Sequence, residues 1–247
     1  MRLLLLLFPS LFLWSASLEA CYRVFFLFIP VAESCVNYIR DGDEIRVRPW
    51  ARTAVIGRLV KRVDSRGESV LVGLQPNLFV FFQREGPYVR DHEYLFREGG
   101  VEYTIVRHRD KGKEVKKGFF PSRGTLYDPF GVSLLIYLDT PNTRGGSVLM
   151  FYDEKVRKVD YQTVGEEEVE VFGRVYETWK VRFSPGMETR GLLKPKGIWY
   201  AWIDKETNIP VLLKVGFTIG SAYIYLERLK GDRRLLKEIK ETVLSYP

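Results

Sequence analysis

The chain has 247 residues, of which 46% are hydrophobic and 28% are charged, and its formal net charge at pH 7 is +7. Basic residues interleave with acidic ones, as in RHRDK at 107–111, which indicates a solvated surface and argues against a nucleic-acid partner. The four Asn and three Gln that accompany these charges are a composition typical of proteins from hot environments. No repeat, low-complexity tract or linker divides the chain, so we expect one domain with a sizeable core.

Residues 1–20 have the composition of a secretory signal. Arg2 precedes a largely apolar run that ends at Trp14, and the small residues Ser15, Ala16 and Ser17 follow before Ala20. The run is too short to span a bilayer comfortably, so we expect a cleaved signal, with an uncleaved N-terminal anchor as the alternative. No later segment approaches about 20 consecutive apolar residues. We therefore predict export to a bacterial periplasm and one mature domain over residues 21–247.

Alternation of apolar and polar residues predicts about ten β-strands in the mature chain. In EIRVRPW, at 44–50, Ile45 and Val47 alternate with charged neighbours, which indicates a strand with one dry and one wet face. Segments of the same kind are 22–28, 78–84, 101–109, 147–153, 158–164, 168–172, 178–184, 197–204, 210–217 and 221–229. Successive strands with short connections predict a large antiparallel sheet that curls into a half-barrel.

Two segments are predicted to be helices. Asp128 suits an N-cap and Pro129 the first helical position, and the almost wholly apolar stretch 130–138 ends before Pro141. A short helix that is apolar on nearly every side must be buried, so we expect it in the concave face of the sheet. The C-terminal segment 232–245 predicts an amphipathic helix docked on the outside. Its apolar face would carry Leu235, Leu236, Ile239 and Val243.

The order of these elements resembles that of an exported bacterial family, domain of unknown function three-one-zero-eight. The resemblance is carried by YRVFFLFIPVAES, VDSRGE, SLLIYLD and IWYAWIDKETNIPVLLKVGFTIGSAYIYLERL. The most specific positions are Trp199, Asp204, Pro210, Gly220 and Leu226. Ala32 stands where the family usually has glycine, and Asp139 where its helix often ends in arginine. The resemblance implies the half-barrel fold of the lipoprotein carriers LolA and LolB and an envelope location, but no catalytic residues, since the family has no assigned chemistry.

The sequence contains no motif of a catalytic or metal site. His92 and His108 are its only histidines, neither has a partner at metal-ligand spacing, and we expect both at the surface or at strand edges. The acidic run GEEEVEVFG, at 165–173, is typical of a hairpin with solvated carboxylates, with cation binding as the alternative. We therefore expect a protein without enzymatic activity, cofactor or metal.

Aromatic residues concentrate in the C-terminal strands, where they either line an apolar cavity or fill the core. A cavity in the concave face, with the helix at 129–138 as its plug, predicts a site for a lipid or another hydrophobic envelope component. The candidate ligand-binding residues are Trp179, Phe183, Trp199, Val215, Phe217, Leu134 and Tyr137. A membrane surface is a second candidate partner. The alternative function is an envelope interaction or scaffold protein with a filled core, docking through a strand edge or a basic face.

Cys21 admits three interpretations. Leu18, Ala20 and Cys21 match the pattern at which lipoproteins are cleaved and lipidated, although Tyr22 begins a strand at once and leaves no tether. An oxidising compartment permits a disulfide with Cys35. A hairpin turn near 29–31 would, however, leave Cys21 about 13 Å along the strand from the position opposite Cys35, beyond the limit of about 7 Å for bridging. The third interpretation is an unmodified or differently cleaved product.

Overall fold

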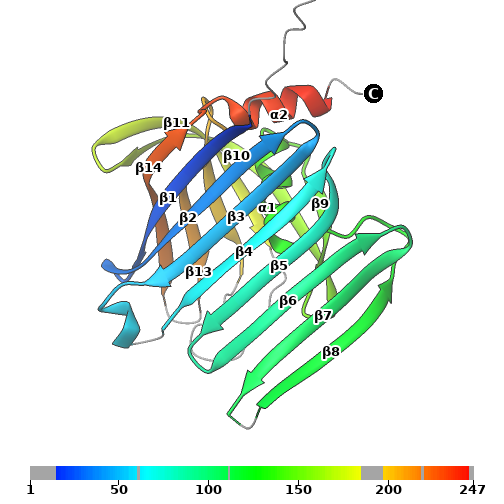
Figure 1. Ribbon diagram of the computed structural model, residues 1–247. Coiled ribbons are helices and arrows are strands. Elements are labelled where there is room, and N and C mark those ends of the chain that lie inside the picture. The colour runs from blue at the N-terminus through cyan, green and yellow to red at the C-terminus, as the bar shows by residue number, and fades with distance from the viewer. Residues whose placement is uncertain (1–14, 60–61, 111, 185–196, 218–219, 245–247) are drawn as a thin grey trace, which may run out of the picture.

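The computed structural model describes residues 15–59, 62–110, 112–184, 197–217 and 220–244. These residues form one antiparallel 14-stranded sheet, two α-helices and a 3-10 turn, η1 (Gly57–Leu59) (Figure 1). The strands are β1 (Ala16–Phe26), β2 (Ile29–Asp41), β3 (Glu44–Thr53), β4 (Asp64–Val72), β5 (Gln75–Glu85), β6 (Tyr88–Arg97), β7 (Gly100–Arg109), β8 (Gly112–Pro121), β9 (Gly146–Tyr152), β10 (Lys155–Val171), β11 (Arg174–Ser184), β12 (Trp199–Asp204), β13 (Pro210–Gly216) and β14 (Ser221–Gly231). The predicted curled antiparallel sheet is confirmed.

The sheet consists of two meanders that meet where β1 pairs with β14. The strand order runs β8-β7-β6-β5-β4-β3-β2-β1-β14-β13-β12-β11-β10-β9, so β8 and β9 form its two edges. The sheet curls but does not close through backbone pairing. Side chains link its two halves instead, since Arg90 in β6 bonds Asp153 at 3.1 Å and Lys116 in β8 bonds Glu154 at 2.5 Å. Both carboxylates belong to the β9–β10 turn.

Helix α1 (Pro129–Leu138) lies inside the curled sheet, as the apolar pattern predicted (Figure 1). The Asp128 carboxylate caps it by accepting the amides of Phe130 at 2.9 Å and Gly131 at 3.0 Å, and it also accepts the Ser69 hydroxyl at 2.6 Å. Burial of this carboxylate raises the pKa of Asp128 to about 6. A side chain on β4 therefore helps to fix the start of the helix within the sheet.

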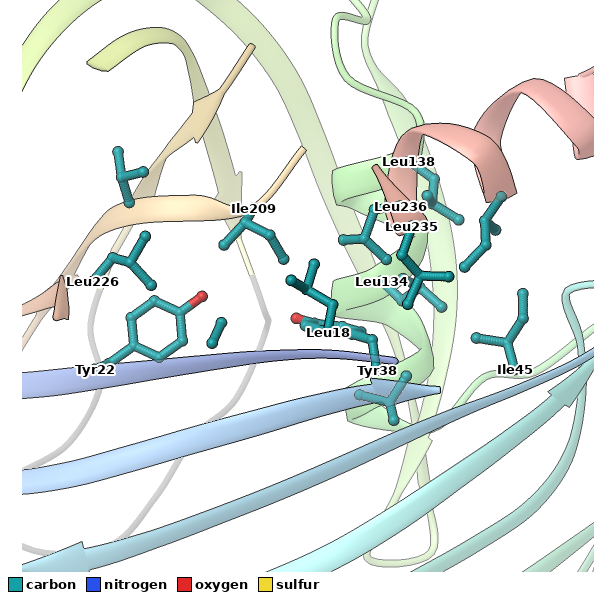
Figure 2. Close-up of a cluster of buried hydrophobic side chains, with 14 of the residues drawn as sticks. Leu18, Tyr22, Tyr38, Ile45, Leu134, Leu138, Ile209, Leu226, Leu235 and Leu236 are labelled. Atoms are coloured by element: carbon teal, nitrogen blue, oxygen red, sulfur yellow. The ribbon is translucent and has the colours of Figure 1, made fainter. Parts of the chain in front are cut away.

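Helix α1 fills the middle of the concave face with three sets of contacts. Leu134 and Leu138 join a cluster with Leu18 and Tyr38 from the first strands (Figure 2). A second cluster consists of residues from α1 and from β9 to β12: Val132, Ile136, Tyr137, Met150, Val159, Val181, Ala201 and Ile203. At the N-terminal end of α1, the Phe130 ring packs 5.2 Å from that of Phe79. These clusters form the core of the protein, because the concave face of the sheet needs a second layer to bury its apolar side chains.

Helix α2 (Leu235–Leu244) lies across one end of the sheet, drawn at the top of Figure 1. Its buried face carries Leu235, Leu236 and Ile239, as predicted, whereas the side chain of Val243 and residue 245 lie outside the described part. The Asp232 amide donates to the Ser17 carbonyl at 2.8 Å, which fixes α2 beside the start of β1. We call the opposite end, where β1 turns into β2, the distal end. No helix in the described ranges is long and apolar enough to cross a membrane.

Strand β1 begins at Ala16, so the domain boundary predicted after residue 20 falls within a strand. Leu18 and Ala20 have no exposed surface, and pairing with β2 extends to Ala16. Ala20, which resembles the last residue of a signal exit, is therefore also a core residue, whereas Ser15 and Ser17 are exposed. Residues 1–14, which contain the apolar run of the predicted export signal, lie outside the described residues.

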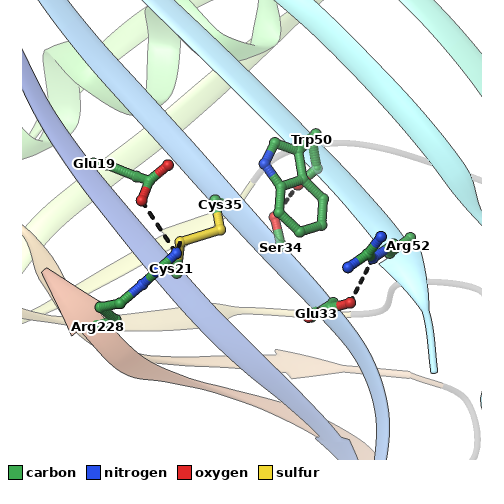
Figure 3. Close-up of a disulfide and its surroundings, with 8 residues drawn as sticks. All are labelled: Glu19, Cys21, Glu33, Ser34, Cys35, Trp50, Arg52 and Arg228. Carbon is green, nitrogen blue, oxygen red and sulfur yellow. Dashed lines mark hydrogen bonds and ion pairs between the residues drawn. A yellow bond between two sulfur atoms is a disulfide. The ribbon is translucent and has the colours of Figure 1, made fainter. Parts of the chain in front are cut away.

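Cys21 and Cys35 form a disulfide, so the expectation from hairpin geometry was wrong (Figure 3). The β1–β2 turn lies at Leu27 and Phe28, which have φ values of 49° and 68°, and not near 29–31. One register shift on the way along the hairpin then places Cys21 directly opposite Cys35, with Cα atoms 4.0 Å apart. Both sulfurs are thereby used, which also contradicts lipidation of the Cys21 thiol.

Candidate ligand site at the distal end of the sheet

Strand register gathers apolar side chains from five neighbouring strands into one row on the concave face. Phe183 pairs with Trp199, and Ala222 pairs with both Val215 and Phe26. Trp199 lies next to Val215, because the adjacent residues Tyr200 and Lys214 are paired in the antiparallel β12–β13 ladder. We call Phe26, Phe183, Trp199, Val215 and Ala222, together with Phe217, the distal row. Four of the seven predicted ligand-binding residues thus come together: Phe183, Trp199, Val215 and Phe217.

The distal row lies beyond the part of the concave face that α1 fills. Phe183 packs at the edge of the second cluster, whereas Trp199, Phe217 and Phe26 belong to none of the three buried clusters. The rings of Phe183 and Trp199 meet edge to face at 5.7 Å, and those of Phe26 and Phe217 at 6.0 Å. These four rings are half-buried. Among the described residues, the row is therefore an aromatic surface that remains partly exposed.

Trp199 also carries an unsatisfied polar group. Its indole Nε1 is buried and has no hydrogen-bond partner among the residues that the structure describes. Buried N–H groups in folded proteins are nearly always paired, with protein, water or ligand. An acceptor oxygen brought by a bound molecule would complete this site.

The other predicted ligand-binding residues lie elsewhere. Leu134 is fully buried and Tyr137 is 9% exposed, and both fill the core from α1. Burial raises the pKa of Tyr137 to about 12. Trp179 lies four residues before Phe183 on β11, towards the other end of the strand, where Lys205 Nζ lies 4.5 Å from its ring centroid. These three residues therefore do not join the distal row.

Several aromatic residues of the C-terminal strands face away from the concave side. Trp202 donates from its indole nitrogen to Glu167 at 2.6 Å, and Tyr223 stacks on Tyr225 with centroids 6.2 Å apart. The tip of the β10–β11 hairpin folds over this outer face, where Phe172 packs 5.9 Å from Tyr225. The acidic run 165–173 belongs to this hairpin, as predicted. Sequence alone could not separate these rings from the distal row, because both sets alternate along the same strands.

Both histidines have side-chain partners within the protein. His92 is only 1% exposed, its Nδ1 lies 2.9 Å from the Tyr94 hydroxyl, and its ring stacks 5.1 Å from Tyr152. Burial lowers the pKa of His92 to about 4, so the expected surface position was wrong for this residue. His108 Nε2 lies 2.7 Å from Asp91. Within the described ranges, no group of three or more His, Cys, Asp or Glu side chains could hold a metal ion.

A hollow of about 260 Å³ lies on the outer face of β6, β7 and β8. Glu93, Glu102 and Lys117 contribute to its lining. Buried apolar ligands require apolar linings, so this hollow is a poor site for an acyl chain.

A large curled antiparallel sheet with one helix in its concave face defines a barrel-like β-protein. The chain belongs to the DUF3108 family, proteins of unknown function, whose model matches residues 21–227. The crystal structure of a beta-barrel-like protein of the domain of unknown function DUF1849 from Brucella abortus is similar, with a TM-score of 0.55. Its sequence is 9% identical, and the match covers 88% of this chain and 98% of that chain, so the likeness concerns the fold alone. Among curated proteins, none matches the sequence.

Proposed function

We propose that this protein is an exported, non-enzymatic carrier or receptor that binds a lipid or acyl chain against the distal row. The observation that carries the proposal is the row itself. Strand register aligns apolar side chains from β11, β12, β13, β14 and β1 at the distal end of the concave face, beyond the described residues that pack against α1. A solid β-protein would cover such a row with its own core.

The chemistry of the row favours an amphipathic ligand with an apolar chain. Phe26, Phe183 and Phe217 offer ring surfaces to methylene groups, which gain about 0.8 kcal/mol for each CH₂ removed from water. The unpaired Trp199 N–H requires an acceptor, which a carboxylate or ester oxygen supplies. A fatty acid or a phospholipid acyl ester combines both features.

The disulfide supports export. Bonds such as Cys21–Cys35 form and persist in the periplasm and outside the cell but are rare in a reducing cytosol. Together with the signal-like residues 1–14, it favours a periplasmic location. The same bond removes a lipid anchor on Cys21 from the proposal.

The second candidate is a scaffold that docks a partner strand. It is favoured by β8, an edge strand in which most residues are exposed, Val115 and Phe119 among them. Three lysines on β8, Lys113, Lys116 and Lys117, oppose it, because charged edge residues are a common defence against strand addition. The carrier therefore remains the better-supported function.

A fluorescence titration with a labelled fatty acid tests the carrier proposal. Phe217→Glu places a charge in the distal row and is expected to weaken binding at least about tenfold, since an acyl chain would then desolvate a carboxylate. Phe119→Glu is the matched control, because it makes the same change at a residue 53% exposed on the outer face of β8. Equal affinity of wild type and Phe217→Glu, with both proteins folded, would contradict the proposed site. Binding of a strand-forming peptide without fatty-acid uptake would favour the scaffold.

A further inference from the structure

Large exposed apolar side chains gather at the distal end of the molecule. The β1–β2 turn presents Leu27, Phe28 and Ile29, which are 55%, 94% and 47% exposed. The loop after β3 presents Val55 and Ile56, which are 80% and 53% exposed. We call these five residues the distal rim. In Figure 1 the β1–β2 turn and η1 lie side by side at the lower left, opposite α2.

The β1–β2 turn and the loop after β3, which together carry the distal rim, are held against each other by backbone contacts. The Ala54 amide donates to the Val31 carbonyl at 2.9 Å, which ties the β3 loop to the start of β2. Gly57 lies so close to this strand that a Cβ on it would come within 2.0 Å of the Val31 oxygen. The loop can therefore pack against the β1–β2 turn only because residue 57 is glycine.

The residues of the turn are poorly suited to its backbone. Two-residue hairpin turns with positive φ at both central positions strongly prefer Asn-Gly, because a Cβ is strained there. Here the two positions are Leu27 and Phe28, with φ of 49° and 68°. Phe28 is 94% exposed, so packing within the chain does not compensate for the strain. A residue that breaks a local rule without a folding benefit indicates selection for contact with something outside the chain.

Positive charge flanks the rim. Arg58 and Arg62 are exposed on the β3–β4 loop, and neither takes part in an ion pair with another described residue. The acidic side chain of the neighbouring hairpin, Glu33, is already paired with Arg52 at 2.5 Å. The rim thus combines apolar tips with two guanidinium groups that no described side chain pairs, the combination that favours an anionic bilayer over another protein surface.

We infer that the distal rim docks this protein onto the surface of an anionic lipid bilayer. Phe28, Val55 and Ile56 enter the boundary between headgroups and acyl chains, and Arg58 and Arg62 contact phosphate groups. Phe26 links the rim to the distal row, since it precedes Leu27 and contacts Phe217 at 6.0 Å. Docking would therefore bring the distal row to the bilayer, but it requires no ligand and is independent of the carrier proposal.

Flotation of the purified, processed protein with vesicles tests the inference. Wild type is expected to float with vesicles of phosphatidylethanolamine and phosphatidylglycerol, and less with phosphatidylcholine alone or at high salt. Phe28→Asn is the decisive variant, because asparagine tolerates positive φ. It should bind these vesicles at least about tenfold more weakly while its thermal midpoint stays equal or rises. Arg58→Gln should lose part of the preference for the anionic vesicles.

Phe119→Asn removes an equally large exposed ring from β8 and should leave flotation unchanged. Undiminished flotation of Phe28→Asn would overturn the inference, and so would a lowered midpoint of that variant, since Phe28 would then serve folding. A wild-type dimer that Phe28→Asn converts to a monomer, without flotation of either, would assign the rim to a second copy of the chain instead. Fatty-acid uptake in the absence of vesicles should be unaffected by Phe28→Asn, which separates this test from that of the carrier site.

Discussion

Cys21 lies directly opposite Cys35 in the β1–β2 ladder, and their sulfur atoms are bonded across the two strands. These are the only two cysteines of the chain, so the bond leaves no thiol for a lipid anchor. It joins β1, which links the two meanders, to β2, its partner in the hairpin that carries three of the five residues of the distal rim.

Reduction of this disulfide is expected to destabilise the protein. Closing a loop of this length typically contributes about 3 kcal/mol, largely by restricting the unfolded chain. Unfolding in guanidinium chloride, with and without a reductant, measures the difference. A Cys21→Ala, Cys35→Ala double variant is the control, because its stability should not respond to the reductant. Equal midpoints for oxidised and reduced wild type would contradict a structural role.

The processed chain is expected to begin at or before Ala16. Cleavage after Ala20 would remove Leu18 from the core, and loss of a fully buried leucine side chain costs about 2–5 kcal/mol. Intact-mass measurement of the exported protein gives its first residue. A mature chain beginning at Cys21, particularly one heavier by a diacylglyceryl group, would show that β1 does not form as described.

Asp128 should make stability depend on pH. Burial raises the pKa of its carboxyl from 3.8 to about 6 in the folded protein. The protonated carboxyl therefore contributes fully to the free energy of unfolding below the unfolded-state pKa, and this contribution is lost as the pH rises through the folded-state pKa. The loss amounts to about 3 kcal/mol. Asp128→Asn still caps α1 but does not titrate. Urea unfolding should therefore show the stability of this variant, relative to wild type, rising by about 3 kcal/mol between about pH 3 and pH 7. A difference that stays constant would contradict a buried, titrating carboxyl.

Trp199→Phe is expected to weaken fatty-acid binding without unfolding the protein. The change keeps an aromatic ring in the distal row but removes the N–H that a ligand oxygen would accept. One hydrogen bond contributes about 1 kcal/mol, which corresponds to about a fivefold loss of affinity. Trp179→Phe is the control, because Trp179 lies outside the row. An unchanged affinity of Trp199→Phe would mean that the indole does not bind the headgroup.

Sequence pattern predicted the elements whose determinants are local. The α1 helix follows from Asp128, Pro129 and the apolar run before Pro141, and its bounds match the prediction. Strand alternation predicted the sheet, but the predicted segments do not include β2, β4, β6 or β8. One strand was also divided wrongly where a bulge interrupts alternation, since 158–164 and 168–172 are one strand, β10, with a register shift between Thr163 and Gly165.

Features set by register and by distant packing could not be predicted from the sequence. The turn at Leu27 and Phe28 has none of the residues that mark a hairpin, so the pairing of Cys21 with Cys35 was missed. His92 is buried because the β9–β10 turn, about sixty residues away, packs over β6; the Asp153 amide donates to Tyr94 at 3.1 Å beside it. The distal row depends on the register of five strands, which no single segment contains.

Native mass spectrometry of the processed protein, purified from a bacterial envelope, is the most direct test of lipid binding at the distal row. We predict a species that carries a noncovalent lipid, which is released on collisional activation and is absent from Phe217→Glu but present in Phe119→Glu. A bare wild-type protein that takes up no fatty acid even after incubation with an excess would contradict the carrier function and leave the scaffold as the better account.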